Sequence, residues 1–302
     1  MSMPTHVRIV EVGPRDGLQN EKAIVPTAVK IELIDRLSET GLQTVEATSF
    51  VSPKWVPQLA DAADVYTSIR KKPGVRYPVL VPNLQGYERA RSVGATEIAV
   101  FTAASEAFNR KNINATIDES IDRFVPVMER ARADGVGVRG YVSTVLGCPY
   151  QGKVPVADVV RVAKRLHELG CHEVSLGDTI GIGTPAKARF MLAAVAEQVP
   201  MSALAVHFHD TRGQALANIL ACLELGVGVV DSAVSGVGGC PYARGATGNV
   251  ASEDVVYMLH GMGIATGIDL DKLIDAGKYI SDYLERKPNS RAATAILNKR
   301  SA

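Results

Sequence analysis

The sequence has little cysteine and no excess of charge of either sign. Its 302 residues include four cysteines, Cys148, Cys171, Cys222 and Cys240, with no CxxC pair among them. This number and spacing exclude a disulfide framework and a structural zinc site, so we expect reduced thiols. The 33 Lys and Arg residues nearly balance 32 Asp and Glu residues, for a net charge of +1. Such a balance disfavours nucleic acid or an anionic membrane as a partner and favours a small molecule.

The sequence also lacks long hydrophobic runs. No apolar stretch approaches the ~18 residues that a membrane helix needs. The first residues, MSMPTHVRIVEVG, contain neither the basic run nor the apolar segment of a signal peptide. We therefore expect a cytoplasmic protein with no membrane contact. Since 46% of the residues are hydrophobic and 22% are charged, we also expect a sizeable folded core.

Short runs rich in Val and Ile alternate with helical segments along the whole chain. Thr116 and Glu119 form a possible capping box, and Ser52-Pro53 and Thr184-Pro185 each place a proline at the first position of a predicted helix. Buried strands are predicted at residues 7–13, 44–49, 77–81, 97–103, 138–144, 173–178, 203–209 and 229–236. Each strand is followed by a helical segment, so the pattern is a βα unit repeated eight times.

This repeat predicts an α/β fold, a single (β/α)8 TIM barrel with an extra C-terminal helix. We expect one domain over residues 1–302, with the barrel at about 5–265 and a helical extension at about 266–302. The extension should hold a helix near 270–284, followed by a frayed polar end. An open doubly wound sheet is the alternative. It is disfavoured because GPRDGLQN follows the first strand where a Gly-x-Gly-x-x-Gly motif would be expected.

Polar residues gather at the predicted carboxyl ends of the strands, where active sites of such barrels lie. His207 and His209 are two apart on one strand, so their side chains point to the same side and can bind one metal ion. Asp16 is the candidate carboxylate ligand, and its neighbour Arg15 is a fixed cation suited to stabilising an oxyanion. Other polar residues at these ends, which either cap the barrel rim or orient the site, are Glu46 and Asp178.

A glycine-rich stretch, GVGGCPYARGATGN, follows the last predicted strand. Its five glycines predict a mobile lid that brings the Cys240 thiol to the site as a proton donor or nucleophile. Asn249 at its end offers an oxygen ligand to the metal. The alternative interpretation is a flexible turn in which the cysteine has no role.

These motifs give the chain a resemblance to the 3-hydroxy-3-methylglutaryl-CoA lyase family of metal-dependent lyases. The motifs that carry it are EVGPRDGLQNE, ATSFVSPKWVPQ, RGYVS, GCPY, SLGDTIG, HFHDTRGQALAN and SGVGGCPYARGATGN. The resemblance implies that one Mg²⁺ or Mn²⁺ ion is bound by Asp16, His207, His209 and Asn249. It also implies an enolate-stabilising Arg15, a catalytic Cys240, and supporting acids at Glu46 and Asp178. The residues that match substrate-side or rim positions are Arg139, Tyr141, Ser175 and Thr179.

The implied reaction is retro-Claisen cleavage of (S)-3-hydroxy-3-methylglutaryl-CoA to acetyl-CoA and acetoacetate, a step of leucine degradation and ketone-body formation. Asp16 and His207 are both candidates for the general base. The implied partners are an acyl-CoA substrate and a second copy of the chain, in a homodimer or larger homo-oligomer. Three alternatives stay open: a lyase for a longer homologue such as the isohexenyl one, a Claisen-condensing synthase, and a non-enzymatic CoA-binding module.

Overall fold

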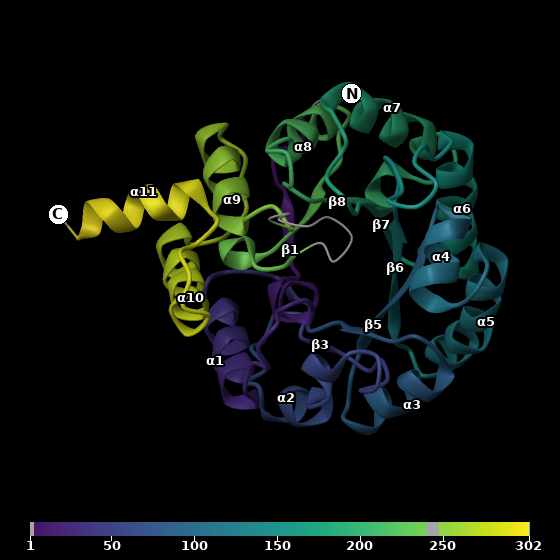
Figure 1. Ribbon diagram of the computed structural model, residues 1–302, viewed down its shortest axis with the longest axis horizontal. Coiled ribbons are helices and arrows are strands. Elements are labelled where there is room, and N and C mark those ends of the chain that lie inside the picture. The colour runs from purple at the N-terminus through teal and green to yellow at the C-terminus, as the bar shows by residue number, and fades with distance from the viewer. Residues whose placement is uncertain (1–2, 240–247, 302) are drawn as a thin grey trace.

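A computed structural model describes residues 3–239 and 248–301 of the chain (Figure 1). Parallel strands form one curved sheet in the order β2-β1-β9-β8-β7-β6-β5-β4-β3. The strands are β1 (Arg8–Glu11), β2 (Thr44–Val45), β3 (Thr48–Ser49), β4 (Val79–Leu80), β5 (Glu97–Ala103), β6 (Gly137–Ser143), β7 (Glu173–Asp178), β8 (Leu204–Phe208) and β9 (Val229–Ser232). All of their pairings are parallel, as in a chain of βα units.

The predicted strand 44–49 is split into β2 and β3, and this split closes the sheet. β2 pairs with β1, whereas β3 pairs with β4. Between them the backbone N–H of Glu46 donates to the carbonyl of Glu11 at 2.8 Å, and that of Ala47 donates to Pro78 at 3.0 Å. One segment therefore bonds to both edges of the sheet. The predicted TIM barrel is confirmed, while the prediction of an unbroken strand over residues 44–49 was wrong.

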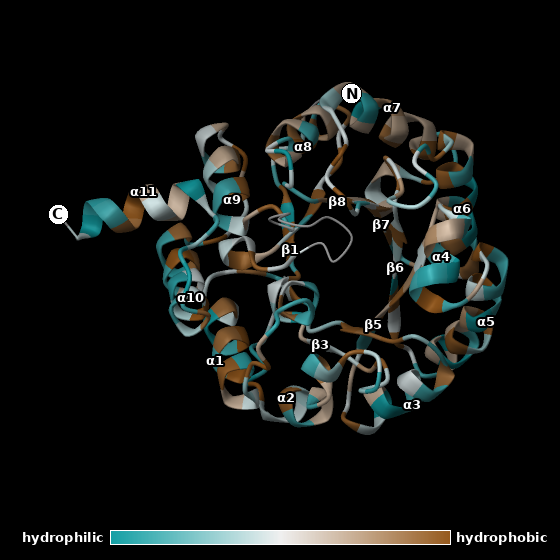
Figure 2. Cartoon of the chain, in the orientation of Figure 1, coloured by the Kyte–Doolittle hydropathy of each residue, from teal (hydrophilic) through white to brown (hydrophobic). Residues whose placement is uncertain are grey.

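Helices surround the strands on the outside of the ring in Figure 1. They are α1 (Thr27–Ser38), α2 (Ala62–Ser68), α3 (Leu84–Ser92), α4 (Glu106–Ile113), α5 (Ile117–Ala133), α6 (Val156–Leu169), α7 (Pro185–Ala196), α8 (Ala215–Leu223), α9 (Ser252–Gly261), α10 (Leu270–Tyr283) and α11 (Arg291–Arg300). Short helical turns are η1 (Gly13–Gly17), η2 (Pro57–Leu59), η3 (Met201–Ala203) and η4 (Val234–Gly236). In Figure 2 many helices carry both hydrophobic and hydrophilic residues, as expected of helices packed on a core.

Helix α6 shows how the sequence produces this packing. Val159, Val162, Ala163 and Leu166 recur at helical spacing and are all fully buried. Full burial of a valine or leucine side chain stabilises the fold by about 1.5–3 kcal/mol. Because the strands are also buried on both faces, the apolar core lies mainly between the barrel and its helices.

Two helix starts were predicted from a Ser-Pro or Thr-Pro pair, and one of them was wrong. Helix α7 begins at Pro185 after Thr184, as predicted. After Ser52, however, the chain makes only a turn, and helical structure starts at Pro57 as η2. The reason is local: a proline restricts the residue before it, and Val56, which precedes Pro57, has a non-helical backbone with φ −131° and ψ 78°.

Helix α10 matches the predicted helix near 270–284. The frayed polar end was a wrong prediction, because residues 291–300 form α11. Ser290 caps this helix by accepting a hydrogen bond from the N–H of Ala293 at 2.9 Å, and Asp254 of α9 accepts one from Ala292 at 2.8 Å. None of the described helices combines the length and apolar character that crossing a bilayer requires.

Candidate active site

The turn η1 carries Arg15 and Asp16 at the carboxyl end of β1. Its sequence, GPRDG, forms a short π-helical turn in which the N–H groups of Asp16 and Gly17 donate to the carbonyl of Val12, at 2.8 and 3.1 Å. Position 17 requires glycine, because a Cβ there would lie 2.5 Å from Cγ2 of Val237. The turn thus packs directly against the start of the glycine-rich stretch.

Asp16, His207 and His209 form a group that could hold a metal ion. One ligand atom from each lies within 4.8 Å of the other two. Nε2 of His207 lies 3.9 Å from Oδ2 of Asp16, and the two imidazole centroids are 5.4 Å apart. The alternation of side chains along a strand explains why both histidines reach this point, while Phe208 between them is buried in the core.

The protonation states of two of these residues suit metal binding. Burial would raise the pKa of Asp16, but Arg15 and the two histidines outweigh it and lower that pKa to about 2. Burial and the neighbouring His207 lower the pKa of His209 to about 4, so its imidazole is neutral at pH 7. Nδ1 of His209 is buried and has no hydrogen-bond partner among the described residues. A neutral imidazole with an unpaired nitrogen beside a carboxylate is a donor set that fits a divalent ion.

Asn249 lies beside this group. The chain here runs antiparallel to the end of β8. Asn249 and His209 form an isolated backbone β-bridge, and the N–H of Val250 donates to the carbonyl of Phe208 at 3.3 Å. The Asn249 side chain presents its Nδ2, which donates to Oδ2 of Asp16 at 2.9 Å. Asn249 thus lies next to the predicted ligand Asp16, and its own role as a metal ligand stays a prediction.

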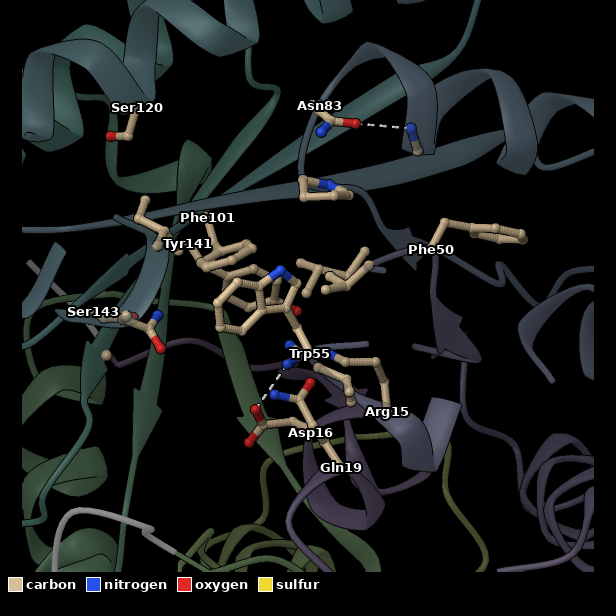
Figure 3. Close-up of a pocket in the computed structure, with 18 of the residues that line it drawn as sticks. Arg15, Asp16, Gln19, Phe50, Trp55, Asn83, Phe101, Ser120, Tyr141 and Ser143 are labelled. Carbon is tan, nitrogen blue, oxygen red and sulfur yellow. Dashed lines mark hydrogen bonds and ion pairs between the residues drawn. The ribbon is translucent and has the colours of Figure 1, made fainter. Parts of the chain in front are cut away.

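Arg15 is fixed between two carboxylates, of which Figure 3 shows that of Asp16. Its Nε and Nη2 each lie 2.8 Å from Oε2 of Glu46, and Nη1 lies 2.8 Å from Oδ1 of Asp16. Glu46 is fully buried, and its Oε1 has no hydrogen-bond partner among the described residues. The guanidinium also lies 5.4 Å from the ring centroid of Tyr141. Glu46 therefore orients Arg15, which holds a positive charge at the edge of the cavity.

A cavity of about 950 Å³ opens over these residues. Phe50, Trp55 and Phe101 add apolar groups to its lining, and Figure 3 shows them among the residues around the cavity. Further residues that line it are Asp16, Gln19, Tyr141, Ser175, Thr179, His207, His209, Arg89, Lys111 and Arg123. The predicted substrate-side residues Tyr141, Ser175 and Thr179 are thus brought together here.

The structure places Arg139 elsewhere than predicted. It is 1% exposed, and the described residues that line the cavity do not include it. Its Nε donates to Glu173 at 2.7 Å, and its Nη1 and Nη2 donate to Asp231 at 3.0 and 2.6 Å. An arginine whose donors are used in this way beneath the cavity is not available to a substrate, so this expectation needs correction.

Asp178 also takes a different place from the predicted catalytic one. It is fully buried, and the described lining of the cavity does not include it. Its Oδ2 accepts a hydrogen bond from the N–H of Gly183 at 2.8 Å, and its Oδ1 accepts one from Ile182 at 3.3 Å. Asp178 thus holds the loop between β7 and α7, beside Thr179, whose Oγ1 accepts from the N–H of Thr144 at 2.9 Å.

Two buried acids support η4, which leads into the glycine-rich stretch. Oε1 of Glu11 accepts hydrogen bonds from the N–H groups of Gly13 and Val234, both at 2.8 Å. Glu253 accepts from the N–H of Ser235, a residue with a positive φ of 58°. Burial raises the pKa of Glu11 to about 7 and that of Glu253 to about 8. Cys240 itself lies outside the described residues, and the other three cysteines are free thiols, as predicted.

Comparison with known proteins agrees with this architecture. A model of the HMGL-like family matches residues 6–280. Hydroxymethylglutaryl-CoA lyase of Gallus gallus is 61% identical over 294 residues, which cover 97% of this chain and 99% of that protein. The chain belongs to the hydroxymethylglutaryl-CoA lyase family. The resemblance drawn from its motifs is thereby confirmed.

Solved structures of hydroxymethylglutaryl-CoA lyases share the same fold. The enzyme of Pseudomonas aeruginosa is 58% identical, with a TM-score of 0.97 over 99% of this chain and 100% of that one. A lyase of Acinetobacter baumannii, solved with coenzyme A and 3-methylmalate, is 38% identical, with a TM-score of 0.92 over 96% and 95% of the two chains. The group formed by Asp16, His207 and His209 is thus a possible metal site in a chain of this family.

Proposed function

We propose that the protein is a carbon–carbon lyase that cleaves 3-hydroxy-3-methylglutaryl-CoA to acetyl-CoA and acetoacetate. The observation that carries this proposal is the cluster of Arg15, Asp16, His207 and His209 on the wall of one large cavity. The cluster occupies a chain about 60% identical to curated lyases of that name over nearly its full length. Neither the isohexenyl homologue nor a non-enzymatic module has comparable support.

The proposed cofactor is one Mg²⁺ or Mn²⁺ ion. Asp16, His207 and His209 would hold it, and Asn249 would add its amide oxygen. When bound, such an ion lowers the pKa of a hydroxyl group and polarises carbonyl oxygens. Oxygen and imidazole ligands in this ratio suit either metal, so the choice between them belongs to experiment.

The protein's own groups would divide the remaining chemistry. A base takes the proton of the substrate's 3-hydroxyl: Asp16 can do so with the carboxylate oxygen that does not bind the ion, and His207 only while its Nε2 is not bound to the ion. The electrons of the breaking carbon–carbon bond move onto the acetyl-CoA fragment, where the enolate oxygen meets the guanidinium of Arg15. Arg15 suits this role because Glu46 and Asp16 fix its position before the reaction. The fragment then takes up a proton, for which we propose the thiol of Cys240 or a water that it orders.

The outer part of the cavity suits a coenzyme A thioester. Arg89, Lys111 and Arg123 line it, so cations are available to the phosphate groups of the ligand. Trp55, which is 83% exposed, and Phe50 offer apolar surface in the same cavity. The relative from Acinetobacter baumannii was solved with coenzyme A, which supports an acyl-CoA as the substrate class.

We also propose a single-domain enzyme that acts in the cytoplasm as a homodimer or larger homo-oligomer. Relatives named as cytoplasmic lyases, such as that of Mus musculus at 60% identity, support the location, although mitochondrial relatives are equally similar. Most soluble oligomers are homo-oligomers with closed symmetry, and the dimer is the commonest. Light scattering after gel filtration should give a mass of at least twice 32.1 kDa.

The deciding experiment measures acetoacetate released from the CoA thioester. Activity should be lost in EDTA and return with added Mg²⁺ or Mn²⁺. The absence of product under every metal condition would overturn the proposed function. Comparison of kcat/KM for 3-hydroxy-3-methylglutaryl-CoA and a longer 3-hydroxyglutaryl-CoA homologue would then show which acyl chain length the enzyme prefers. We expect the shorter substrate to be preferred.

A further inference from the structure

Asp231, on β9, is the meeting point of a buried polar network beneath the cavity. It is 1% exposed, and four donor groups converge on its carboxylate. Oδ1 accepts from Nη2 of Arg139 at 2.6 Å, while Oδ2 accepts from Nη1 of Arg139 at 3.0 Å and from Oγ of Ser175 at 2.7 Å. Nδ1 of His207 lies 3.3 Å from the same Oδ2. The carboxylate therefore faces donors on all sides.

This geometry determines how His207 can present its ring. An ionised carboxylate can only accept hydrogen bonds, so Nδ1 of His207 must carry the hydrogen that points at Asp231. Nε2, on the other side of the ring, faces Oδ2 of Asp16 at 3.9 Å. With Nδ1 as the donor, the neutral ring keeps its lone pair on Nε2.

We infer that Asp231 is a positioning residue of the metal site: it fixes the tautomer and orientation of His207 so that Nε2 presents its lone pair beside Asp16. The inference rests on the metal site assigned under the proposed function. Carboxylates in this relation to a ligand histidine typically change metal affinity by about 10–100-fold when they are replaced. Ser175 and Arg139 hold Asp231 in place but do not contact the His207 ring nitrogen themselves.

Asparagine at position 231 would oppose this arrangement while nearly preserving shape. If its amide NH₂ faced His207, Nδ1 would have to accept, and the hydrogen would move to Nε2, where it blocks the metal-facing lone pair. If the amide were turned over, its NH₂ would face the guanidinium of Arg139, which also only donates. Either orientation sets a donor against a donor.

Glu173 provides a matched control within the same network. It is a buried carboxylate that accepts from Nε of Arg139 at 2.7 Å and also contacts Arg8, but no contact joins it to His207 among the described residues. Glu173→Gln therefore also perturbs the hydrogen bonding of Arg139, through the bond from its Nε. It should leave the ring of His207 as it is, because Asp231 stays ionised and bonded to Nδ1.

The test is the Kd of the metal-free protein for Mn²⁺, measured by calorimetry without substrate for wild type, Asp231→Asn and Glu173→Gln. Thermal unfolding in EDTA should show both variants destabilised. Mn²⁺ affinity should fall by about 10–100-fold in Asp231→Asn and change by less than about threefold in Glu173→Gln. Equal affinity in both variants would overturn the inference. If wild type bound no Mn²⁺, the proposed metal site would fail together with it, whereas binding without lyase activity would overturn only the proposed function.

A second measurement needs no variant, so it decides the matter even if Asp231→Asn does not fold. Wild-type protein with ¹⁵N-labelled histidine and saturating Mg²⁺ would be studied by long-range ¹H–¹⁵N correlation. His207, assigned by its absence in His207→Gln, should show a protonated Nδ1. A bare Nδ1 on that ring would contradict the role of Asp231 directly.

Discussion

Replacing Arg15 with lysine keeps the positive charge but removes the planar fork of the guanidinium. In the native protein three of its nitrogens are used: Nε and Nη2 face Glu46, and Nη1 faces Asp16. The single ammonium group of lysine cannot make all three of these contacts to Glu46 and Asp16. Glu46, which is fully buried, would lose most of its hydrogen bonding.

The expected magnitude follows from these contacts. Loss of a hydrogen bond between charged groups costs about 1.5–3 kcal/mol, so Arg15→Lys should lower the free energy of unfolding by about this amount. Misplacing a group that stabilises an oxyanion costs about 2.7–4 kcal/mol of activation free energy, or about 10²–10³-fold in kcat. The variant should therefore lose most of its activity while it remains folded.

The assay is acetoacetate formation under saturating metal and substrate, together with thermal unfolding and metal content. Arg189→Lys is the matched control, because Arg189 pairs with Glu224 at the surface, where both side chains are about half exposed. This control should change neither kcat nor stability measurably. If Arg15→Lys retained a kcat within tenfold of wild type, the fixed guanidinium would not be the enolate-stabilising group.

Three other predictions follow from the structure and the proposed function. Cys240→Ser should lower kcat by orders of magnitude with little change in bound metal, and near-wild-type turnover would refute the role of the thiol. Because burial raises the pKa of Glu253 from 4.5 to about 8, its contribution to stability is complete below pH 4.5 and is lost as the pH rises through 8. Tm should fall across that range in wild type and less steeply in Glu253→Gln, and parallel curves would contradict this. Trp55 is the only tryptophan in the sequence and lines the cavity, so coenzyme A should change the intrinsic fluorescence, and a saturable change in Trp55→Phe would count against it.

The sequence predicted most of the barrel because its strands are short apolar runs with clear ends. The ranges 97–103 and 173–178 agree with β5 and β7. The sequence does not show the break between β2 and β3 at Glu46 and Ala47. The break arises because β2 pairs with β1 while β3 pairs with β4. Helix α11 could not be predicted from its polar composition, because its start is held by Asp254 from another helix.

The site was predicted where residue type and strand position agree, as for Asp16, His207 and His209. The sequence could not show which polar side chains reach the cavity and which are buried beneath it. Asp178 ends β7 whereas Arg139 lies near the amino end of β6, and the donors and acceptors of both are already used by other protein groups. Asp231 was not predicted, because it lies within a strand whose other residues are mostly apolar or small. The signal was present, since a charge within VVDSAVSG has to be paired when it is buried.

The hydrogen bond between Asp16 and Asn249 joins residues 233 positions apart, and Glu11 and Ser252, bonded at 2.5 Å, are 241 apart. The first and last βα units of the barrel therefore meet at the same point. Contacts of such high sequence separation cannot form until both ends of a long chain segment are present and have been brought together. During synthesis on the ribosome, a chain that has already built its first seven βα units still lacks a complete site. The capacity to bind metal and substrate should thus appear only when the last unit is made, which keeps partly folded chains inactive.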